Sequence, residues 1–465
     1  MARQLFGTDG VRGRAGDFLS AELALSLGRA AVGHARAPAP GAPGQGGPAP
    51  GAPADGARPQ VLIVRDTRES GEMLEAAIAA GVASGGGDAL LAGVLPTPAA
   101  PLLVRRHRLQ MAAVISASHN PYQDNGIKLF AADGFKLDDA AEHAIEDALG
   151  RPRAAPAQIG GVRQLHGALE DYLRELQTRF AGLDLRGRRV LLDCAHGATY
   201  RAAPEIFRRL GAEVEVLADA PDGRNINDGC GSTHLDPLRE RARSGGFELA
   251  FAFDGDGDRV LGVDGDGEVV DGDELVALAA LHLHAEGRLP GEGVAVTVMT
   301  NYGFHTAMAT AGVRVATTAV GDRYVLDELR RRGWGLGGEQ SGHIIELGFG
   351  PSGDGIASAL LVLEALRGRD LRERAAMAKL PQRLVNIRAS DRTALVQTMA
   401  APELGAAIET EQGALAGRGR VLVRASGTEP LIRVMVEAPS SDETDAVCGR
   451  LAGAVRATLG DRCEG

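Results

Sequence analysis

A loop between two predicted strands carries the residue types that phosphoryl chemistry on a serine requires. Residues 112–115 form a short apolar run that predicts a strand, residues 127–130 predict a second strand, and the Asn-Pro and Asn-Gly pairs between them predict turns. Ser118 and His119 lie in the intervening loop, and Lys128 lies on the second strand. A serine hydroxyl can act as a nucleophile, and nearby cations offset the charge of a phosphoryl group. The alternative is a polar loop without chemistry, and this stretch alone does not decide between them.

Lysine is rare in this chain. Of 50 lysines and arginines, lysine stands only at positions 128, 136 and 379. Where nearly every cation is arginine, a lysine beside the serine loop is expected to do something that arginine cannot. Proton transfer is such a task, because the pKa of lysine can be tuned by its surroundings and that of arginine cannot.

Three carboxylates alternate with glycine after an apolar strand: Asp254, Asp256 and Asp258 in Phe-Asp-Gly-Asp-Gly-Asp-Arg. Small residues between them let the backbone fold so that three oxygens converge, and hard oxygen ligands suit Mg²⁺ or Ca²⁺. An EF-hand loop is excluded, since its sixth position is Arg259 rather than glycine and its twelfth is Gly265 rather than glutamate. A plain acidic turn is disfavoured because three carboxylates this close repel one another without a cation.

Two later loops could bind a phosphorylated sugar. Glu339, Ser341 and His343 alternate along a glycine-rich loop and could hydrogen-bond vicinal sugar hydroxyls, although solvent-facing turn residues would look the same. The loop over residues 424–433 offers hydroxyls, a backbone nest and arginines on both sides, which outlines a phosphate site. No Gly-Lys-Ser/Thr and no Gly-x-Gly-x-x-Gly after a strand is present, so a nucleotide cofactor is not indicated.

The elements that must position these loops follow a repeating pattern. A strand, a helix, a glycine and a second strand recur over residues 61–91, 190–217 and 294–317. This pattern predicts three similar α/β domains with mixed, mainly parallel sheets. Residues 36–60 are almost all Ala, Pro and Gly and predict a flexible insertion. Strands at 384–388, 421–424 and 431–436, then a helix opened by a Ser440–Glu443 capping box, set the last ~90 residues apart.

Composition narrows the class of protein. A net charge of −11 argues against general binding to DNA or anionic membranes, and 4% aromatic residues argue against stacking on nucleic-acid bases. The N-terminus has no apolar signal core, and the four cysteines are widely spaced. We therefore expect a soluble cytoplasmic protein with no nucleic acid or membrane partner.

Taken together, these motifs resemble the α-D-phosphohexomutase superfamily over nearly the full chain. Its four signatures are the serine loop, the Asp-Gly-Asp-Gly-Asp-Arg metal loop, the Gly-Glu-x-Ser-Gly-His sugar loop and the Arg-x-Ser-Gly-Thr-Glu phosphate loop, and all four are present. Within the superfamily, residues 7–13, 225–233 and 424–435 are similar to the branch that acts on glucosamine phosphates. The 36–60 insertion departs from the pattern but puts no site residue in doubt.

The resemblance implies an activity. Ser118 would carry a phosphoryl group, and the three aspartates would hold Mg²⁺ together with an oxygen of that group. Transfer to glucosamine 6-phosphate would give a sugar 1,6-bisphosphate, which turns over in the cleft and leaves glucosamine 1-phosphate for amino-sugar and cell-wall precursor synthesis. A kinase or a bisphosphate would first phosphorylate Ser118, and a homodimer is left open.

The resemblance also implies domains and roles. It places domain boundaries at residues 1–155, 156–252, 253–372 and 373–465, the last being a smaller α+β domain, around a central cleft. Lys128 is the first choice for proton transfer, with His343 and Arg12 in support and His119 beside the nucleophile. The implied substrate-binding residues are Arg259, Arg323, Glu339, Ser341, His343, Arg424, Ser426, Gly427, Thr428 and Arg433.

Three alternatives stay open at this stage. The same chemistry could act on mannose or glucose phosphates, because no residue is an obvious partner for a 2-amino group. A phosphosugar-binding protein without turnover is disfavoured by the intact nucleophile, metal and lysine residues. A phosphatase would pass the phosphoryl group to water and would be recognised by release of inorganic phosphate.

Overall fold

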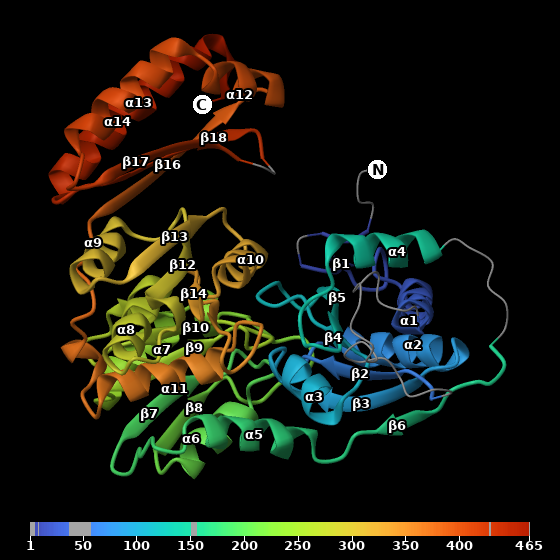
Figure 1. The fold of residues 1–465 in the computed structure, drawn as a ribbon. Coiled ribbons are helices and arrows are strands. Elements are labelled where there is room, and N and C mark those ends of the chain that lie inside the picture. The colour runs from blue at the N-terminus through green and yellow to red at the C-terminus, as the bar shows by residue number, and fades with distance from the viewer. Residues whose placement is uncertain (1–4, 8, 37–56, 150–155, 427–428, 465) are drawn as a thin grey trace. The chain divides into compact units, whose positions relative to one another are not determined.

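The computed structural model of the 465-residue chain describes residues 5–7, 9–36, 57–149, 156–426 and 429–464 (Figure 1). Its contacts divide the chain into two compact units, which are described separately below. The first unit is Met1–Val298 with Val313–Arg374, and the second is Met299–Gly312 with Ala375–Gly465. Most of the predicted 36–60 insertion, residues 37–56, lies outside the described residues.

The first sheet of the first unit has six strands in the order β1-β5-β4-β2-β3-β6. Strand β2 pairs in parallel with β3 and β4, whereas β5 pairs antiparallel with β4 and β1. The strands are β1 (Val11–Arg14), β2 (Gln60–Arg65), β3 (Asp88–Val94), β4 (Met111–Ile115), β5 (Asp124–Ala131) and β6 (Val162–Gln164). The helices are α1 (Ala21–Arg36), α2 (Ser70–Ser84), α3 (Ala99–His107) and α4 (Asp139–Leu149).

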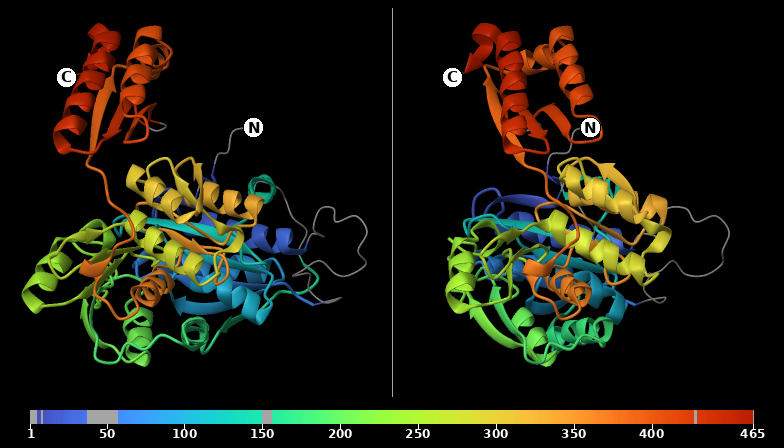
Figure 2. Two further views of the ribbon diagram at one scale, coloured as in Figure 1. Left: turned by 60° about the vertical axis from the view of Figure 1, so that its left-hand side comes forward. Right: turned by 90° about the vertical axis from the view of Figure 1, so that its left-hand side faces the viewer.

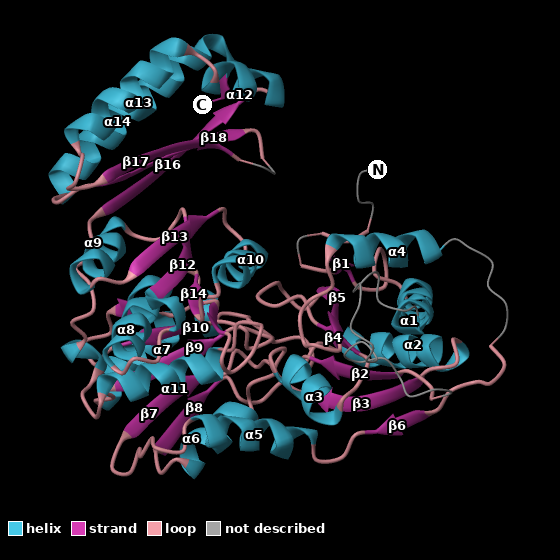
Figure 3. Cartoon of the chain, viewed as in Figure 1, coloured by secondary structure: helices cyan, strands magenta, loops and turns pink. Residues whose placement is uncertain are grey.

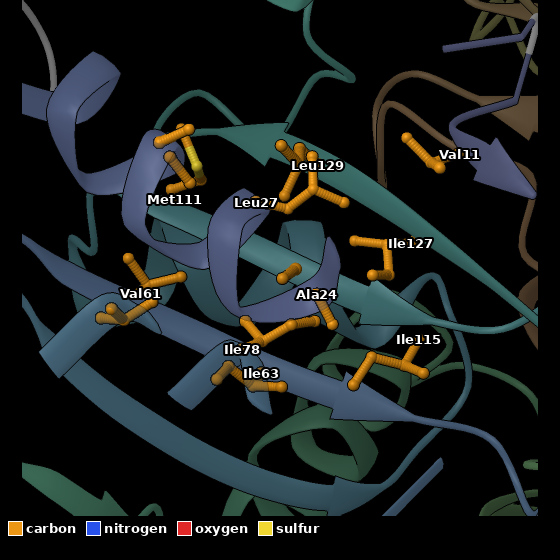
Figure 4. Packing of buried hydrophobic residues seen from close by; sticks show 14 of the residues in the cluster. Val11, Ala24, Leu27, Val61, Ile63, Ile78, Met111, Ile115, Ile127 and Leu129 are labelled. Atoms are coloured by element: carbon orange, nitrogen blue, oxygen red, sulfur yellow. The ribbon is translucent and has the colours of Figure 1, made fainter. Parts of the chain in front are cut away.

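The core of this domain lies between its helices and its sheet. Figure 4 shows Leu27 of α1 and Ile78 of α2 beside Ile63, Met111 and Leu129 of the strands, and all five are buried. Apolar runs such as residues 61–64 are fully buried because helices cover the sheet, as expected of parallel strands. Strand β4 lies inside this buried sheet and ends at Ile115, where the serine loop begins. The sheet therefore positions the start of that loop.

Two further sheets complete the first unit. One has the order β11-β10-β9-β7-β8 and the other β13-β12-β14-β15, and each combines parallel and antiparallel pairs. Their strands are β7 (Arg189–Asp193), β8 (Glu213–Leu217), β9 (Leu249–Phe253), β10 (Val260–Val263), β11 (Val269–Val270), β12 (Gly293–Thr297), β13 (Arg314–Thr318), β14 (Leu336–Gly338) and β15 (Ile344–Glu346). Their helices are α5 (Ala168–Arg179), α6 (Ala202–Arg209), α7 (Asp236–Gly245), α8 (Gly272–Ala285), α10 (Asp322–Arg332) and α11 (Gly355–Leu366), with short 3-10 helices η1 (Gly231–Thr233), η2 (Pro290–Glu292) and η3 (Leu371–Glu373).

The second unit is built on an antiparallel sheet of order β17-β18-β16-β19. Its strands are β16 (Gln382–Ala389), β17 (Arg420–Ala425), β18 (Leu431–Glu437) and β19 (Cys463–Glu464), and its helices are α9 (Tyr302–Ala311), α12 (Arg392–Met399), α13 (Pro402–Ala414), α14 (Ser441–Leu459) and η4 (Gly460–Arg462). Helices α13 and α14 lie side by side on one face of this sheet (Figures 2 and 3). Mainly parallel sheets with helices in the first unit, and this smaller antiparallel sheet with helices, match the predicted fold class.

Several local predictions are confirmed and two are wrong. The strand–helix–glycine–strand units are all present, and Gly211 and Gly312 beside two of the helix ends have positive φ. The glycines at positions 7, 10 and 13 predict a tight loop over residues 6–13, but residues 11–14 form β1, because they pair antiparallel with Asp124–Ile127, the first half of β5. The capping box is half formed: Ser440 Oγ accepts from Glu443 N at 3.2 Å, but the Glu443 carboxylate pairs with Arg418. Among the described residues, no helix has both the length and the apolar character needed to cross a bilayer.

Candidate active site

Ser118 lies three residues beyond the end of β4 and is 1% exposed. Its Oγ donates to Asp254 Oδ2 at 2.5 Å and lies 3.4 Å from His119 Nδ1. Its backbone has φ of 53°, a left-handed conformation that residues other than glycine adopt infrequently. The serine loop and the carboxylate loop, 136 residues apart, therefore meet at one hydroxyl.

The three aspartates follow the buried strand β9 in a tight turn that leads into β10. All three side chains are buried, and one oxygen from each lies within 4.8 Å of the others. Burial and the neighbouring carboxylates raise the pKa of Asp254 well above its ordinary value. Oδ1 of Asp256 and Oδ1 of Asp258 are buried and have no hydrogen-bond partner among the described residues. Converging hard oxygens with unused lone pairs fit a divalent metal ion, and these residues form a site that could hold one.

Lys128 projects from β5 into the same cluster. Its Nζ lies 3.0 Å from Asp256 Oδ2, 3.7 Å from Asp258 Oδ2 and 3.2 Å from Asp9 Oδ2, and the residue is 1% exposed. Burial alone would lower the pKa of Lys128, but the three carboxylates outweigh burial and raise it. The side chain is therefore an ammonium at neutral pH in this arrangement.

A second lysine extends this network. Lys136 Nζ lies 2.5 Å from both Asp9 Oδ1 and Asp322 Oδ2, so it links the N-terminal segment to α10. Asp9 also accepts from Arg12. The sequence analysis did not assign Lys136, although the rarity of lysine that singled out Lys128 applies to it equally.

His119 and Arg259 form a pair beside the nucleophile. Arg259 Nη1 donates to His119 Nδ1 at 3.1 Å, and Arg259 N donates to Asp254 Oδ1 at 3.1 Å. Burial and the charge of Arg259 lower the pKa of His119, which keeps the imidazole neutral. Arg259 thus holds both the metal loop and the histidine next to Ser118.

The predicted sugar loop lies beside the metal loop. It connects β14 to β15, and backbone pairing joins Arg259 to His343. Glu339 is buried and its Oε1 accepts from Gly321 N at 3.0 Å, whereas Ser341 is exposed. His343 Nε2 accepts from Gly353 N at 3.1 Å, and its Nδ1 lies 3.6 Å from Asp258 Oδ2.

Arg323, predicted to bind substrate, forms ion pairs with side chains of α4. Its guanidinium pairs with Asp139 Oδ1 at 2.5 Å and lies 3.9 Å from Glu142. It lines a cavity of the first unit together with Lys128, Lys136 and His343. Two carboxylates already partner Arg323, so a contact with substrate would compete with them.

The predicted phosphate loop belongs to the second unit, between β17 and β18. Arg424 and Arg433 are directly opposite in the ladder, and Ser426 N donates to Leu431 O at 2.8 Å. Nε of Arg433 is buried without a hydrogen-bond partner among the described residues. Gly427 and Thr428, predicted as ligands, lie outside the described residues.

Some residues of the site belong to no motif that the sequence analysis singled out as chemical, and they were not predicted. Thr97 Oγ1 donates to Asp256 Oδ2 at 2.7 Å, and Arg68 and Asn227 hold the backbone of the serine loop. The structure brings together Ser118, His119, Lys128, the three aspartates, Arg259 and His343, and Arg12 joins them through Asp9.

Comparison with known proteins identifies families and relatives that are similar to this chain. Phosphoglucomutase/phosphomannomutase alpha/beta/alpha domain I matches residues 49–155, domain II residues 170–267, domain III residues 271–384 and the C-terminal domain residues 384–454. The phosphoglucosamine mutase of Moorella thermoacetica is 48% identical over 456 residues, which cover 96% of this chain and 98% of that protein.

Two solved structures share the fold. A phosphoglucomutase/phosphomannomutase family protein from Burkholderia thailandensis has a TM-score of 0.79 at 22% identity, covering 97% of both chains. The Aspergillus fumigatus N-acetylphosphoglucosamine mutase in complex with GlcNAc-6P and magnesium has a TM-score of 0.63 at 18% identity, covering 98% of this chain and 96% of that one. With four consecutive domain matches and a relative nearly half identical along its full length, the chain belongs to the phosphoglucomutase/phosphomannomutase family.

Proposed function

We propose that the chain interconverts glucosamine 6-phosphate and glucosamine 1-phosphate through a phosphoserine at Ser118. The observation that carries this proposal is the Ser118 hydroxyl, which lies 2.5 Å from Asp254 within a cluster of three carboxylates and a lysine. The amino sugar is supported by the 48% identity to a phosphoglucosamine mutase over almost the whole chain. The product would serve amino-sugar supply in the cytoplasm.

Asp254, Asp256 and Asp258 would hold the metal ion, which we propose to be Mg²⁺. All three are buried and offer hard oxygens, and the Aspergillus enzyme of the same fold was solved with magnesium. When bound, Mg²⁺ supplies positive charge that polarises the phosphoryl group and offsets repulsion between it and an anionic substrate.

Phosphoryl transfer proceeds in two halves. In the first, the C1 hydroxyl of glucosamine 6-phosphate attacks the phosphorus of phospho-Ser118; a new O–P bond forms, the Oγ–P bond breaks, the C1 hydroxyl loses its proton, and Ser118 Oγ gains a proton from solvent. In the second, Ser118 Oγ attacks the 6-phosphoryl group of the turned 1,6-bisphosphate and loses its proton to solvent, while the sugar O6–P bond breaks and O6 gains a proton. The enzyme is phosphorylated again and glucosamine 1-phosphate is released.

Lys128 is the group to which we assign proton transfer with the sugar. Its Nζ accepts the proton of the attacking hydroxyl in the first half, and the ammonium returns a proton to the leaving sugar oxygen in the second. For the second role, the raised pKa of Lys128 keeps Nζ protonated, so a proton is present at the site. For the first role, Nζ must be a neutral amine. This would be favoured when the negative charge of Asp256 and Asp258 is offset by a bound metal ion as well as by Lys128. Arg12 is a poorer candidate, since a guanidinium is not deprotonated in proteins and Asp9 pairs with it.

Substrate recognition is divided among loops. Glu339 and Ser341 would hydrogen-bond the 3- and 4-hydroxyls, with His343 beside them, and Arg259 would line the site next to Ser118. The second unit supplies Arg424, Ser426 and Arg433, with Gly427 and Thr428 of the same loop, to bind the phosphate that is not reacting. The opposed arginines and the unpartnered Arg433 Nε support an anion at this loop.

A substrate comparison tests the proposal. Phosphorylated enzyme with Mg²⁺ and a trace of sugar 1,6-bisphosphate is given glucosamine, glucose or mannose 6-phosphate, and kcat/KM is compared for each 1-phosphate. A strong preference for glucosamine supports the assignment. Faster turnover of glucose or mannose would keep the mechanism and overturn the substrate. Release of inorganic phosphate without mutase activity would identify a phosphatase.

A further inference from the structure

The backbone of Ser118 is held in an infrequent conformation from two directions. Its φ of 53° is left-handed, yet the residue is buried and its hydroxyl is aimed at Asp254. A serine does not favour this conformation by itself, so neighbouring groups must select it.

Arg68 holds the loop from within the first domain. It is fully buried, its Nε pairs with Asp66 Oδ2 at 3.1 Å, and its Nη2 donates to Ser118 O at 2.9 Å and Asn120 O at 2.8 Å. Asp66 Oδ2 also accepts from Ser116 Oγ at 2.5 Å, and that hydroxyl accepts from Ser118 N at 2.9 Å. Both the N–H and the C=O of Ser118 are thereby fixed through one buried ion pair.

Asn227 holds the same loop from the second domain. Its Nδ2 donates to Ser118 O at 3.0 Å and to Asn120 O at 3.1 Å, the two carbonyls that Arg68 also binds. Asn227 is 5% exposed, and its own N donates to Ala195 O at 2.9 Å. It belongs to the polar loop that links β8 to η1.

The metal loop packs against this clamp. A side chain added at Gly255 would meet Asn227 Nδ2 and Ser118 O at 2.7 Å each. The absence of a side chain at this position lets the backbone between Asp254 and Asp256 lie against the carbonyl of Ser118. The clamp, the serine and the metal loop are thus in direct contact.

We propose that Arg68 and Asn227 are positioning residues that hold Ser118 Oγ at the carboxylate site for phosphoryl transfer. This inference rests on the proposed function, because it concerns the reactivity of the phosphoserine. Neither side chain has a contact with Lys128, the three aspartates or the sugar loop among the interactions of the described residues. Their effect is exerted through the backbone of the serine loop.

The test is Asn227→Asp, which keeps the size of the side chain but replaces two donors with an oxygen that faces two carbonyl oxygens. Asn225→Asp is the matched control, since Asn225 Nδ2 donates to Ala220 O within its own loop. Two rates are measured: mutase turnover of glucosamine 6-phosphate, and formation of phospho-Ser118 from dephosphorylated enzyme and glucose 1,6-bisphosphate, followed by intact mass. The Tm of each variant reports folding.

We expect Asn227→Asp to lower kcat and the phosphorylation rate in parallel by about 100-fold, the effect of a displacement near 1 Å, while KM stays close to that of the wild type. Asn225→Asp keeps wild-type rates. Arg68→Lys, which retains the charge but lacks the planar fork, gives the same direction of change if Asn227→Asp does not fold.

Unchanged rates in a folded Asn227→Asp or Arg68→Lys variant would overturn the inference and leave both residues with a purely structural role. A rise in KM at constant kcat would also overturn it. If the wild type is phosphorylated on Ser118 but has no mutase turnover, the proposed function fails, and the phosphorylation rates of the variants still decide the inference. No phosphorylation of the wild type would overturn both.

Discussion

Arg424 of β17 and Arg433 of β18 are direct partners in the antiparallel ladder of the second unit. Like charges directly opposite on adjacent strands are destabilising unless an anion lies between them. Burial and the charge of Arg433 lower the pKa of Arg424, and the nearest carboxylate to Arg433, that of Glu429, lies 3.9 Å away.

Replacing Arg433 with Ala should therefore weaken substrate binding rather than chemistry. A hydrogen bond to a charged group contributes about 1.5–3 kcal/mol, so KM for glucosamine 6-phosphate should rise about 10- to 100-fold. More sugar 1,6-bisphosphate should also escape into solution. Steady-state kinetics with detection of the bisphosphate measure both effects. Arg383→Ala, an exposed arginine of the same sheet, is the control, and an unchanged KM for Arg433→Ala would contradict the phosphate-site assignment.

Lys136→Met should destabilise the first unit. It removes the cation shared by Asp9 and Asp322, and loss of one partner from a largely buried ion pair typically lowers the free energy of unfolding by about 3 kcal/mol. Asp9 also lies 3.2 Å from Lys128, so activity should fall with stability. Urea denaturation followed by circular dichroism measures the change. Lys379→Met serves as the control at the remaining lysine, and a Lys136→Met curve that overlays the wild type would refute the network.

Asp354 should make stability depend on pH between about 4 and 6. Burial raises the pKa of Asp354 from 3.8 to about 6, so in this interval the folded state binds more protons than the unfolded state. The free energy of unfolding should therefore fall as pH rises, by about 3 kcal/mol over the interval.

Asp354→Asn should flatten this dependence. An asparagine can still accept from Ala357 N at the start of α11 and from the Tyr172 hydroxyl, but it does not titrate. Asp391→Asn, which changes an exposed cap of α12, should keep the wild-type slope. Denaturation midpoints of the three proteins are measured across pH 4–6. Parallel curves for Asp354→Asn and the wild type would contradict the claim that Asp354 causes the pH dependence.

Metal binding should offset the repulsion among the three aspartates and so raise the free energy of unfolding. Mg²⁺ at about 100 times its Kd should raise the free energy of unfolding by about 2.7 kcal/mol, and chelation should abolish mutase activity without unfolding the chain. Asp254→Asn replaces a buried carboxyl whose ionisation is opposed by burial and by two neighbouring carboxylates, so it should be at least as stable as the wild type in EDTA. The same variant should gain little from Mg²⁺. Thermal melts with and without Mg²⁺ test this, and an equal gain for wild type and Asp254→Asn would place the metal elsewhere.

Sequence reasoning found what is encoded locally. The strand–helix units were predictable because apolar runs, helices and glycines follow one another within about 30 residues. The three aspartates lie within one turn, and the opposed arginines flank one short loop. Residues whose partners lie far away were not found. Arg68 and Asn227 are 159 positions apart and meet only because the fold brings two domains to the carbonyl of Ser118. Strand β1 was missed for the same reason, since four residues gain strand geometry only by pairing with β5.

The shared hold on Ser118 bears on how such a chain can diverge. Its nucleophile comes from one domain, one of its backbone anchors from the next, and the carboxylate that its hydroxyl faces from the turn between β9 and β10. A recombination event that exchanged a single domain with a distant relative would import a serine without its anchor or an anchor without its serine. We therefore expect residues 66–258 to be inherited as one block. Sequence differences between relatives should then concentrate in segments that do not contact the serine loop, the Asn227 anchor or the carboxylate turn.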